Sequence, residues 1–128
     1  MKRQPAWIDK RALLLLHEES LATFGGATGL RDEGLLDSAL GRAPNRRQYD
    51  TAADLADLAA AYGFGLAKNH AFVDGNKRVA FLAIGLFLDI NGKGLRAEQT
   101  DAIRTILNLA AGSLDEAGLA SWIRANIA

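Results

Sequence analysis

The chain has 128 residues, a length typical of one compact domain, and 49% of them are hydrophobic, which is ample material for a core. It contains no cysteine, and this excludes disulfides and thiolate metal sites within the chain. Fifteen Lys and Arg residues balance fifteen Asp and Glu residues, so the chain lacks the overall basic field of a typical nucleic-acid-binding protein.

The first predicted helix runs from about Lys10 to Phe24. Asp9 is its candidate N-cap, since an Asp side chain accepts hydrogen bonds from the free N–H groups of a first helical turn. Gly25-Gly26 is a typical C-cap signal and is expected to end the helix. A loop rich in glycine and charge, residues 28–34, follows.

The second predicted helix is short, from about Glu33 to Arg42. Ala43-Pro44-Asn45 is expected to break it, because the residue before a proline is pushed out of the helical region. The polar stretch Arg46–Tyr49 is then interpreted as an exposed connection, with at most a small hairpin near residues 45–50.

A third helix is predicted to open at Thr51-x-x-Asp54, which resembles a capping box, and to deliver the chain to Lys68-Asn69-His70. The next helix begins near residues 75–76 and ends at Asn91-Gly92. Its stretch Val79–Leu88 has no polar side chain, and a helix that is apolar all round must be buried. We therefore expect this helix to be the buried centre of the fold.

Two further helices are predicted near the end of the chain. One spans about residues 97–111, with Ile103, Ile106 and Leu107 spaced for one buried face. The other begins at Ser113-Leu114-Asp115-Glu116, a capping box. No alternating strand pattern is longer than a few residues, so we expect an all-α fold, a compact bundle of about six helices.

The hydropathy also bears on location. No apolar segment approaches the roughly 20 residues that span a bilayer. The apolar run Ala12–Leu16 is too short for a signal peptide, and no small-residue cleavage site follows it. We therefore expect one soluble, cytoplasmic domain over residues 1–128, with no membrane contact and no direct nucleic-acid binding.

The stretch His70–Arg78 gathers the most promising chemistry. His70 can accept a proton near neutral pH, although a histidine at a helix end can also serve only as a hydrogen-bond partner of the backbone. Asp74 is a hard oxygen ligand suited to Mg²⁺, or else the N-cap of the following helix. Zinc is a competing interpretation, but it would need further ligands from His17 or from carboxylates elsewhere. We interpret His17 as a surface or structural residue.

The remaining residues of this stretch suit an anion. Gly75 lets the backbone approach a ligand or adopt a positive φ. Asn76, Lys77 and Arg78 place an amide and two cations at a helix N-terminus, and two cations there oppose the helix dipole unless an anion such as phosphate binds. A base, a metal carboxylate and a phosphate grip are together the parts that phosphoryl or nucleotidyl transfer to a hydroxyl requires.

The sequence His70-x-Phe72-x-Asp74-Gly75-Asn76-Lys77-Arg78 resembles the signature of the Fic/Doc superfamily in its Doc branch, H-x-F-x-[DN]-[AG]-N-K-R. Three further stretches, Leu16–Gly26, Gly29–Arg42 and Leu86–Gly92, resemble the same family. The resemblance covers essentially the whole chain. It implies a Fic-like bundle and a death-on-curing (Doc) toxin of a type II toxin–antitoxin module.

The resemblance also implies a reaction. Adenylyltransferases of the superfamily are similar to H-x-F-x-[DE]-G-N-G-R-x-x-R, whereas here Lys77 replaces the second motif glycine and Phe81 the distal arginine. A lysine fills the space, and covers the N–H groups, that a glycine would leave for a diphosphate. The Doc branch implies instead that the γ-phosphate of ATP goes to a threonine of elongation factor Tu, which arrests protein synthesis. Adenylylation and a non-catalytic binding module with the same fold are the alternatives.

The resemblance assigns roles to single residues. His70 would be the base, Asp74 would hold Mg²⁺, Gly75, Asn76, Lys77 and Arg78 would bind the phosphates of ATP, and Lys68 would add a further phosphate contact. The connection Arg46–Tyr49 would be the family's flap, which docks the target. None of the five glutamates follows a Ser or Thr by four residues, as the family's inhibitory motif [ST]-x-x-x-E-[GN] requires. Inhibition in cis by that motif is therefore not expected, and the resemblance implies a separate antitoxin protein as a partner.

Overall fold

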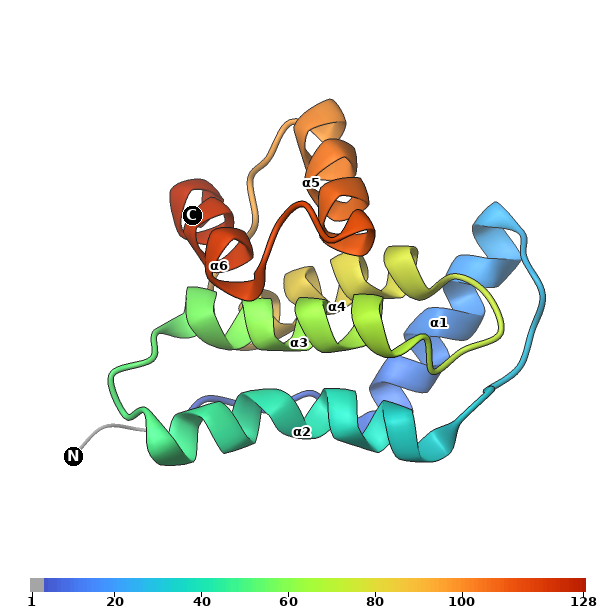
Figure 1. Cartoon of the computed structure of the whole chain (residues 1–128), viewed down its shortest axis with the longest axis horizontal. Helices are drawn as coiled ribbons and strands as arrows, with labels where there is room; N and C mark the ends of the chain where they lie inside the picture. The colour runs from blue at the N-terminus through green and yellow to red at the C-terminus, as the bar shows by residue number, and fades with distance from the viewer. Residues whose placement is uncertain (1–3) are drawn as a thin grey trace.

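The structure of the protein, a computed structural model, describes residues 4–128 and is helical over that range, with no strand. Its helices are α1 (Lys10–Phe24), α2 (Glu33–Tyr49), α3 (Leu55–Asn69), α4 (Asn76–Ile90), α5 (Gln99–Ala111) and α6 (Glu116–Asn126) (Figure 1). The predicted all-α bundle is confirmed. None of the helices in the described part of the chain combines the length and the apolar character needed to cross a membrane.

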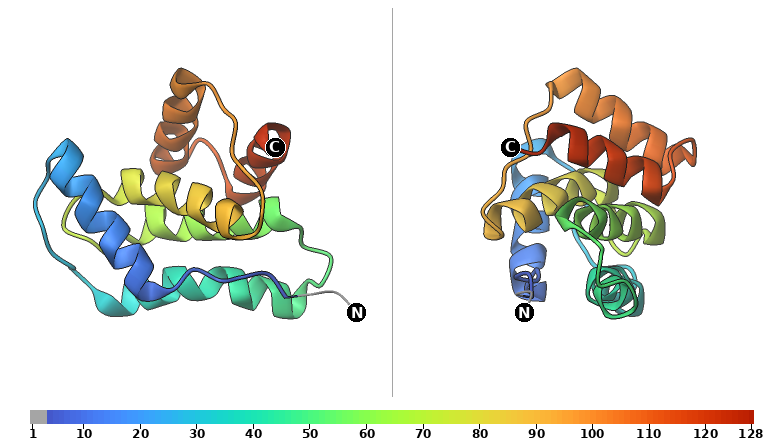
Figure 2. Two further views of the ribbon diagram at one scale, coloured as in Figure 1. Left: turned by 180° about the vertical axis from the view of Figure 1, so that it is seen from behind. Right: turned by 90° about the vertical axis from the view of Figure 1, so that its left-hand side faces the viewer.

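The helices α3 and α4 form the middle of the bundle. None of the residues Val79–Leu88 of α4 is exposed, which confirms that this helix is buried. α3 is enclosed further, because α2, α4 and α6 all pack along it (Figures 1 and 2). Two glycines permit this approach: a Cβ at Gly63 would lie 2.6 Å from Ile84 Cδ1 of α4, and one at Gly65 would lie 3.1 Å from Ala39 Cα of α2.

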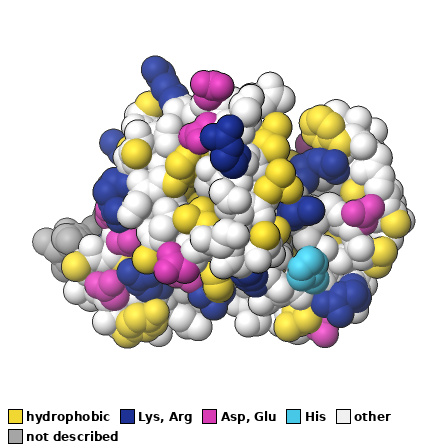
Figure 3. Space-filling view, turned by 45° about the horizontal axis from the view of Figure 1, so that its top comes forward, with side chains coloured by type: hydrophobic (Ala, Val, Ile, Leu, Met, Phe, Trp, Pro, Cys, Tyr) yellow, Lys and Arg dark blue, Asp and Glu magenta, His cyan; other side chains and the backbone are white. Residues whose placement is uncertain are grey.

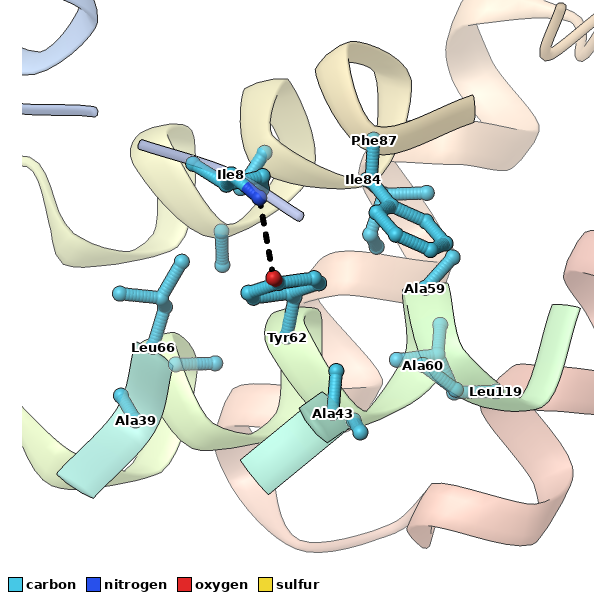
Figure 4. Packing of buried hydrophobic residues seen from close by; sticks show 14 of the residues in the cluster. Ile8, Ala39, Ala43, Ala59, Ala60, Tyr62, Leu66, Ile84, Phe87 and Leu119 are labelled. Carbon is cyan, nitrogen blue, oxygen red and sulfur yellow. Dashed lines mark hydrogen bonds between the residues drawn. The ribbon is translucent and has the colours of Figure 1, made fainter. Parts of the chain in front are cut away.

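The segment before α1 is fastened to this helix pair. The backbone N–H of Ile8 donates to the Tyr62 hydroxyl oxygen at 3.1 Å (Figure 4). Burial of the hydroxyl raises the pKa of Tyr62 above its ordinary value, against the opposing effect of this hydrogen bond. Trp7 stacks on Phe87 with the ring centroids 6.1 Å apart. The same hydrophobic core also takes in Leu119 of α6 (Figure 4), so it joins segments from both ends of the described chain.

The helix α2 is longer than predicted and continues through Pro44 to Tyr49. An interior proline removes one helical hydrogen bond and costs about 3 kcal/mol. The helix persists because Ala43 is fully buried in the core and Arg46 forms ion pairs with acidic side chains of three segments. The predicted hairpin near residues 45–50 is therefore wrong, since these residues form the end of α2 and its C-cap.

Two helices begin later than predicted. α3 is capped by Asp54, which exchanges side chain–backbone hydrogen bonds with Asp57, and the predicted cap Thr51 lies outside the helix. α6 is capped by Asp115 and not by Ser113. In both places the sequence contains two candidate N-caps a few residues apart, Thr51 and Asp54 before α3 and Ser113 and Asp115 before α6. The later one is a carboxylate, whose charge also interacts favourably with the positive end of the helix dipole.

The predicted buried face of α5 is partly wrong. Ile106 is buried, but Ile103 and Leu107 are 53% and 51% exposed. The indole Nε1–H of Trp122 on α6 donates to Asp101 Oδ2 at 2.8 Å. This bond holds α5 in a rotation that turns Ile103 and Leu107 towards solvent.

Candidate active site

The residues predicted to carry the chemistry lie where α3 ends and α4 begins. His70 is the C-cap of α3, and Gly75 is the N-cap of α4. Because α3 and α4 pack side by side and the connection between them is short, His70 and the candidate phosphate ligands lie at the same end of the pair (Figure 1). The C-terminus of α1 and the N-terminus of α2 lie at this end as well (Figures 1 and 2).

His70 has a left-handed backbone conformation, with φ 50° and ψ 48°. It is the only non-glycine residue with a positive φ in the described chain. Such a conformation costs on the order of 1–3 kcal/mol and persists only where the surrounding structure enforces it, which is typical of functional sites. The His70 side chain is exposed and therefore accessible to a substrate. Figure 3 shows a histidine side chain at the surface with lysine and arginine side chains beside it.

The carboxylate of Asp74 is oriented by two backbone donors. Gly75 N donates to Oδ1 at 2.8 Å, and Ala27 N donates to Oδ2 at 3.2 Å. These two hydrogen bonds, together with the charge of Arg78, lower the pKa of Asp74 below its ordinary value of 3.8. Each oxygen keeps a lone pair for a cation, and the side chain is exposed. Asp74 does not cap α4, because Gly75 occupies that position.

The N-terminus of α4 is arranged as an anion site. Gly75 adopts φ 76°, the positive value that its predicted role requires. No side chain caps α4, so the N–H groups of its first turn are available to a ligand. Lys77 is exposed on this turn. Arg78 lies with its guanidinium carbon 4.8 Å from the centroid of the Phe24 ring, which fixes this cation beside the turn.

Asn76 has a different position from the one that its predicted role requires. Its side chain is buried, with Oδ1 accepting from Phe72 N and Nδ2 donating to Phe72 O, both at 3.0 Å. The amide thereby closes the loop between α3 and α4. A phosphate contact from Asn76 would come from its backbone N–H, and the role of its side chain in phosphate binding stays a prediction.

Lys68 points towards the C-terminal end of α5. A Cβ added at Gly112, the C-cap of α5, would lie 3.7 Å from Lys68 Nζ. A cation is favourable there, because the dipole makes that helix end negative. The structure therefore gives Lys68 a structural position, and its predicted phosphate contact stays untested.

His17 proves to be a structural residue of this site. It is 3% exposed, its ring stacks on Phe72 with centroids 3.7 Å apart, and its Nε2 lies 2.7 Å from the backbone oxygen of Asp74. Because a carbonyl only accepts, Nε2 carries the proton. The spacing of Leu13, His17 and Leu21 on one helical face could have predicted this burial.

The loop between α1 and α2 lies against the motif. Leu30 and Phe72 form an isolated antiparallel bridge, and Val73 N donates to Gly29 O at 3.0 Å. The predicted flap, Arg46–Tyr49, is instead at the far end of α3, whose fifteen residues span about 22 Å. The flap assignment is therefore wrong in position, and residues 27–31 are the segment that accompanies the motif.

The hollows on the surface of the described chain include the following two. One, of about 480 Å³, runs between α1 and residues 26–30, and both His17 and Phe72 line it. The other, of about 690 Å³, is lined by residues of the N-terminal segment, the α2–α3 connection and the end of α4. Of these two, the first adjoins the motif and can contribute to the site.

The zinc alternative finds no support in this geometry. Within residues 4–128 no three His, Cys, Asp or Glu side chains are grouped to hold a metal ion. Zinc sites in proteins use three or four such ligands, whereas Mg²⁺ is commonly held by one or two carboxylates together with phosphate oxygens. The single exposed carboxylate of Asp74 beside an anion site matches the second pattern.

Comparisons with known proteins show which family the sequence resembles. Residues 7–88 match the family described as Fic/DOC family. The chain is 47% identical over 88 residues to the Toxin Doc of Mycolicibacterium smegmatis, which covers 66% of this chain and 67% of that protein. It is also 35% identical over 85 residues to the Protein kinase doc of Escherichia phage P1, which covers 66% of this chain and 68% of the relative.

Proposed function

The chain belongs to the Fic/Doc family, and we propose that it is the toxin of a toxin–antitoxin module that phosphorylates a protein threonine with Mg²⁺ and ATP. Two similar proteins carry names that support both parts of this proposal, one as a toxin and the other as a protein kinase. Both matches are above 30% identity.

The observation that carries the choice of reaction is Lys77. It is exposed on the first turn of α4, in the position that a glycine occupies in the adenylyltransferases of the family. Its side chain takes up space and adds a positive charge next to the N–H groups of the turn. The Lys77 ammonium is a compact point charge that can bind a terminal phosphate. Its side chain also takes the space in which a diphosphate would lie along the backbone N–H groups.

The residues present fit Mg²⁺ and ATP. Asp74 is exposed, and its lowered pKa keeps the carboxylate ionised at neutral pH, which a cation requires. The uncapped N-terminus of α4, with Lys77 and Arg78, offers backbone donors and two cations to a phosphate. Bound Mg²⁺–ATP would supply the γ-phosphoryl group and neutralise part of its charge.

Each side chain of the site has its own role in the proposed transfer. His70 accepts the proton of the threonine hydroxyl as the oxygen–phosphorus bond forms and the bond from the γ-phosphorus to ADP breaks. Lys77, Arg78 and the first-turn N–H groups stabilise the charge on the transferred group. His17 and Asn76 hold the loop that carries Asp74, and so keep the geometry fixed.

The target and the partner are proposals that the family resemblance supports. We infer that the acceptor is a threonine of elongation factor Tu, so that modification arrests protein synthesis, and that a separate antitoxin neutralises the protein. Beside the motif, Leu30 and Val73 are 39% and 54% exposed. They offer an apolar surface on which a segment of the target can dock, in place of the flap expected at Arg46–Tyr49.

Paired substitutions test this function. His70→Ala and Asp74→Ala, each expressed from an inducible promoter, are expected to abolish both growth arrest and threonine phosphorylation, because one lacks the base and the other the metal ligand. Arg104→Ala on the exposed surface of α5 is the control and is expected to behave as the wild type. Growth arrest that persists in both active-site variants would contradict the enzymatic proposal and favour a binding module.

A further inference from the structure

Three consecutive carbonyl groups at the end of α3 receive hydrogen bonds from one arginine. Arg31 Nη2 donates to Asn69 O at 3.1 Å, and Arg31 Nε donates to His70 O at 2.7 Å. The backbone N–H of Arg31 donates to Ala71 O at 2.7 Å, and that of Asp32 adds a second bond to the same oxygen at 3.0 Å. The residue at the centre of this series is His70, the one non-glycine residue of the described chain with a positive φ.

This arrangement meets two needs of the helix end. The last carbonyls of a helix have no partner within it, and the dipole makes them the negative end of α3. A guanidinium supplies both donors and charge. The left-handed conformation of His70 also requires outside contacts to persist, since it is unfavourable for a residue with a Cβ. Arg31 binds the carbonyl of Asn69, which precedes the His70 φ angle, and the carbonyl of His70, which follows its ψ angle. It therefore restrains both angles.

The position of Arg31 is itself fixed. Asp32, the next residue, is the N-cap of α2 and accepts from Leu35 N at 3.0 Å. The guanidinium is a rigid planar fork, so Nε and Nη2 can reach two successive carbonyls at once. A lysine at this position would offer only one ammonium and cannot restrain both carbonyls in the same way.

We propose that Arg31 is a positioning residue for the base, holding the His70 backbone in the left-handed conformation that presents the imidazole to the substrate hydroxyl. This inference rests on the proposed role of His70. Nothing in the motif His70–Arg78 identifies Arg31, because it lies 39 residues before His70 in the chain.

A purely structural role for Arg31, as a tie between α2 and α3, has its own control. Asn69 Nδ2 donates to Leu35 O at 2.9 Å, so the Asn69 side chain joins the same two helices and leaves the backbone carbonyls that Arg31 binds in place. Asn69→Ala removes a tie of similar position. We expect this variant to have a lower thermal stability than the wild type and the same kcat.

The test has two independent readouts. In nuclear magnetic resonance, the strong intraresidue amide-to-Hα contact that marks a positive φ at His70 is expected in the wild type and Asn69→Ala, and to be lost in Arg31→Ala. In the γ-phosphate transfer assay, Arg31→Ala is expected to lower kcat roughly 10²-fold, since a small misplacement of a catalytic group has this effect, with KM for ATP unchanged. Arg31→Lys is expected to recover little of the loss.

The outcomes separate the two proposals. A His70 backbone that keeps its positive φ in Arg31→Ala would overturn the positioning role, as would a kcat restored by Arg31→Lys. A positive φ that disappears in Arg31→Ala supports the positioning role even if the wild type transfers no γ-phosphate, a result that would overturn the proposed function alone.

Discussion

At the scale of single residues, the site consists of a few chemical groups and several residues that fix them. Asp74 is held by backbone donors from Gly75 and Ala27 and, through its own carbonyl, by His17. Gly26 makes this approach possible, because a Cβ added there would lie 2.9 Å from Asp74 Oδ2. The carboxylate is therefore placed by α1 and the loop after it as much as by the motif.

His17→Phe tests this support. The variant keeps an aromatic ring against Phe72 but loses the hydrogen bond to the Asp74 carbonyl. Residues that orient a metal ligand typically affect metal affinity by 10- to 100-fold. We expect the Mg²⁺ concentration for half-maximal activity to rise at least roughly tenfold, with little change in activity at saturating Mg²⁺. His17→Gln, which can still donate, is the control, and an unchanged Mg²⁺ dependence in His17→Phe would contradict the role.

At the scale of elements, an ion-pair cluster joins α2, α3 and α6. Arg124 of α6 donates to the N-cap Asp54 of α3 at 2.8 Å and to Asp57 at 3.0 Å. Glu116 at the start of α6 pairs with Arg42 and Arg46 of α2. Pairs this exposed contribute little one by one, but the cluster fixes how α6 sits on α2 and α3.

The pH dependence of stability tests this cluster. The Arg124 guanidinium lowers the pKa of Asp54 to about 2 from the ordinary 3.8, against the opposing effect of partial burial. A lowered pKa contributes stability that is fully present above the unfolded value and is lost as the pH falls through the folded value. Asp54→Asn keeps a capping side chain but removes the charge.

We therefore expect Asp54→Asn to be less stable than the wild type above pH 5, and the difference in free energy of unfolding to shrink between about pH 4 and pH 2. Denaturant titrations at a series of pH values measure this difference. Asp89→Asn, which removes an exposed carboxylate without an ion pair in the described chain, is the matched control. A difference that stays constant down to pH 3 would contradict the account.

The elements also show which features a sequence can reveal. The order of the helices was predictable, because Val79–Leu88 is wholly apolar and glycines mark helix ends at Gly25 and Gly92. The length of α2 was not, since the burial of Ala43 that carries the helix through Pro44 depends on α3. Local signals predicted the elements, and tertiary contacts set their bounds.

The candidate site divides in the same way. Its chemical groups lie together in the chain between His70 and Arg78, so their proximity was predictable. The contacts that support these groups were not predictable. Helical spacing indicates that His17 is buried, but no residue pattern shows that it binds the Asp74 carbonyl or that Arg31 binds the His70 carbonyl. The assignment of Arg46–Tyr49 as the flap was wrong for the same reason, because the sequence does not show that these residues lie at the end of α3 away from the motif.

At the scale of the whole molecule, the candidate site lies at the end of α3, and the ion pairs of Asp54 and Asp57 with Arg124 lie at its start. The region matched to the family ends at residue 88, so α5 and α6 lie beyond it. α6 nevertheless packs along α3 and contributes Leu119 and Ile123 to the core. The C-terminal helices thus support the helix that ends in His70, and the extent of the domain over residues 1–128 stays a prediction.

The transfer of the γ-phosphate from ATP to a protein hydroxyl is the central claim, and isotope position tests it most directly. Purified protein is incubated with elongation factor Tu, Mg²⁺ and ATP labelled either at the α- or at the γ-phosphate, with His70→Ala as the inactive control. We predict label on a threonine of the target from γ-labelled ATP only, and none with His70→Ala. Label that arrives from the α-phosphate would contradict the account and show nucleotidyl transfer instead.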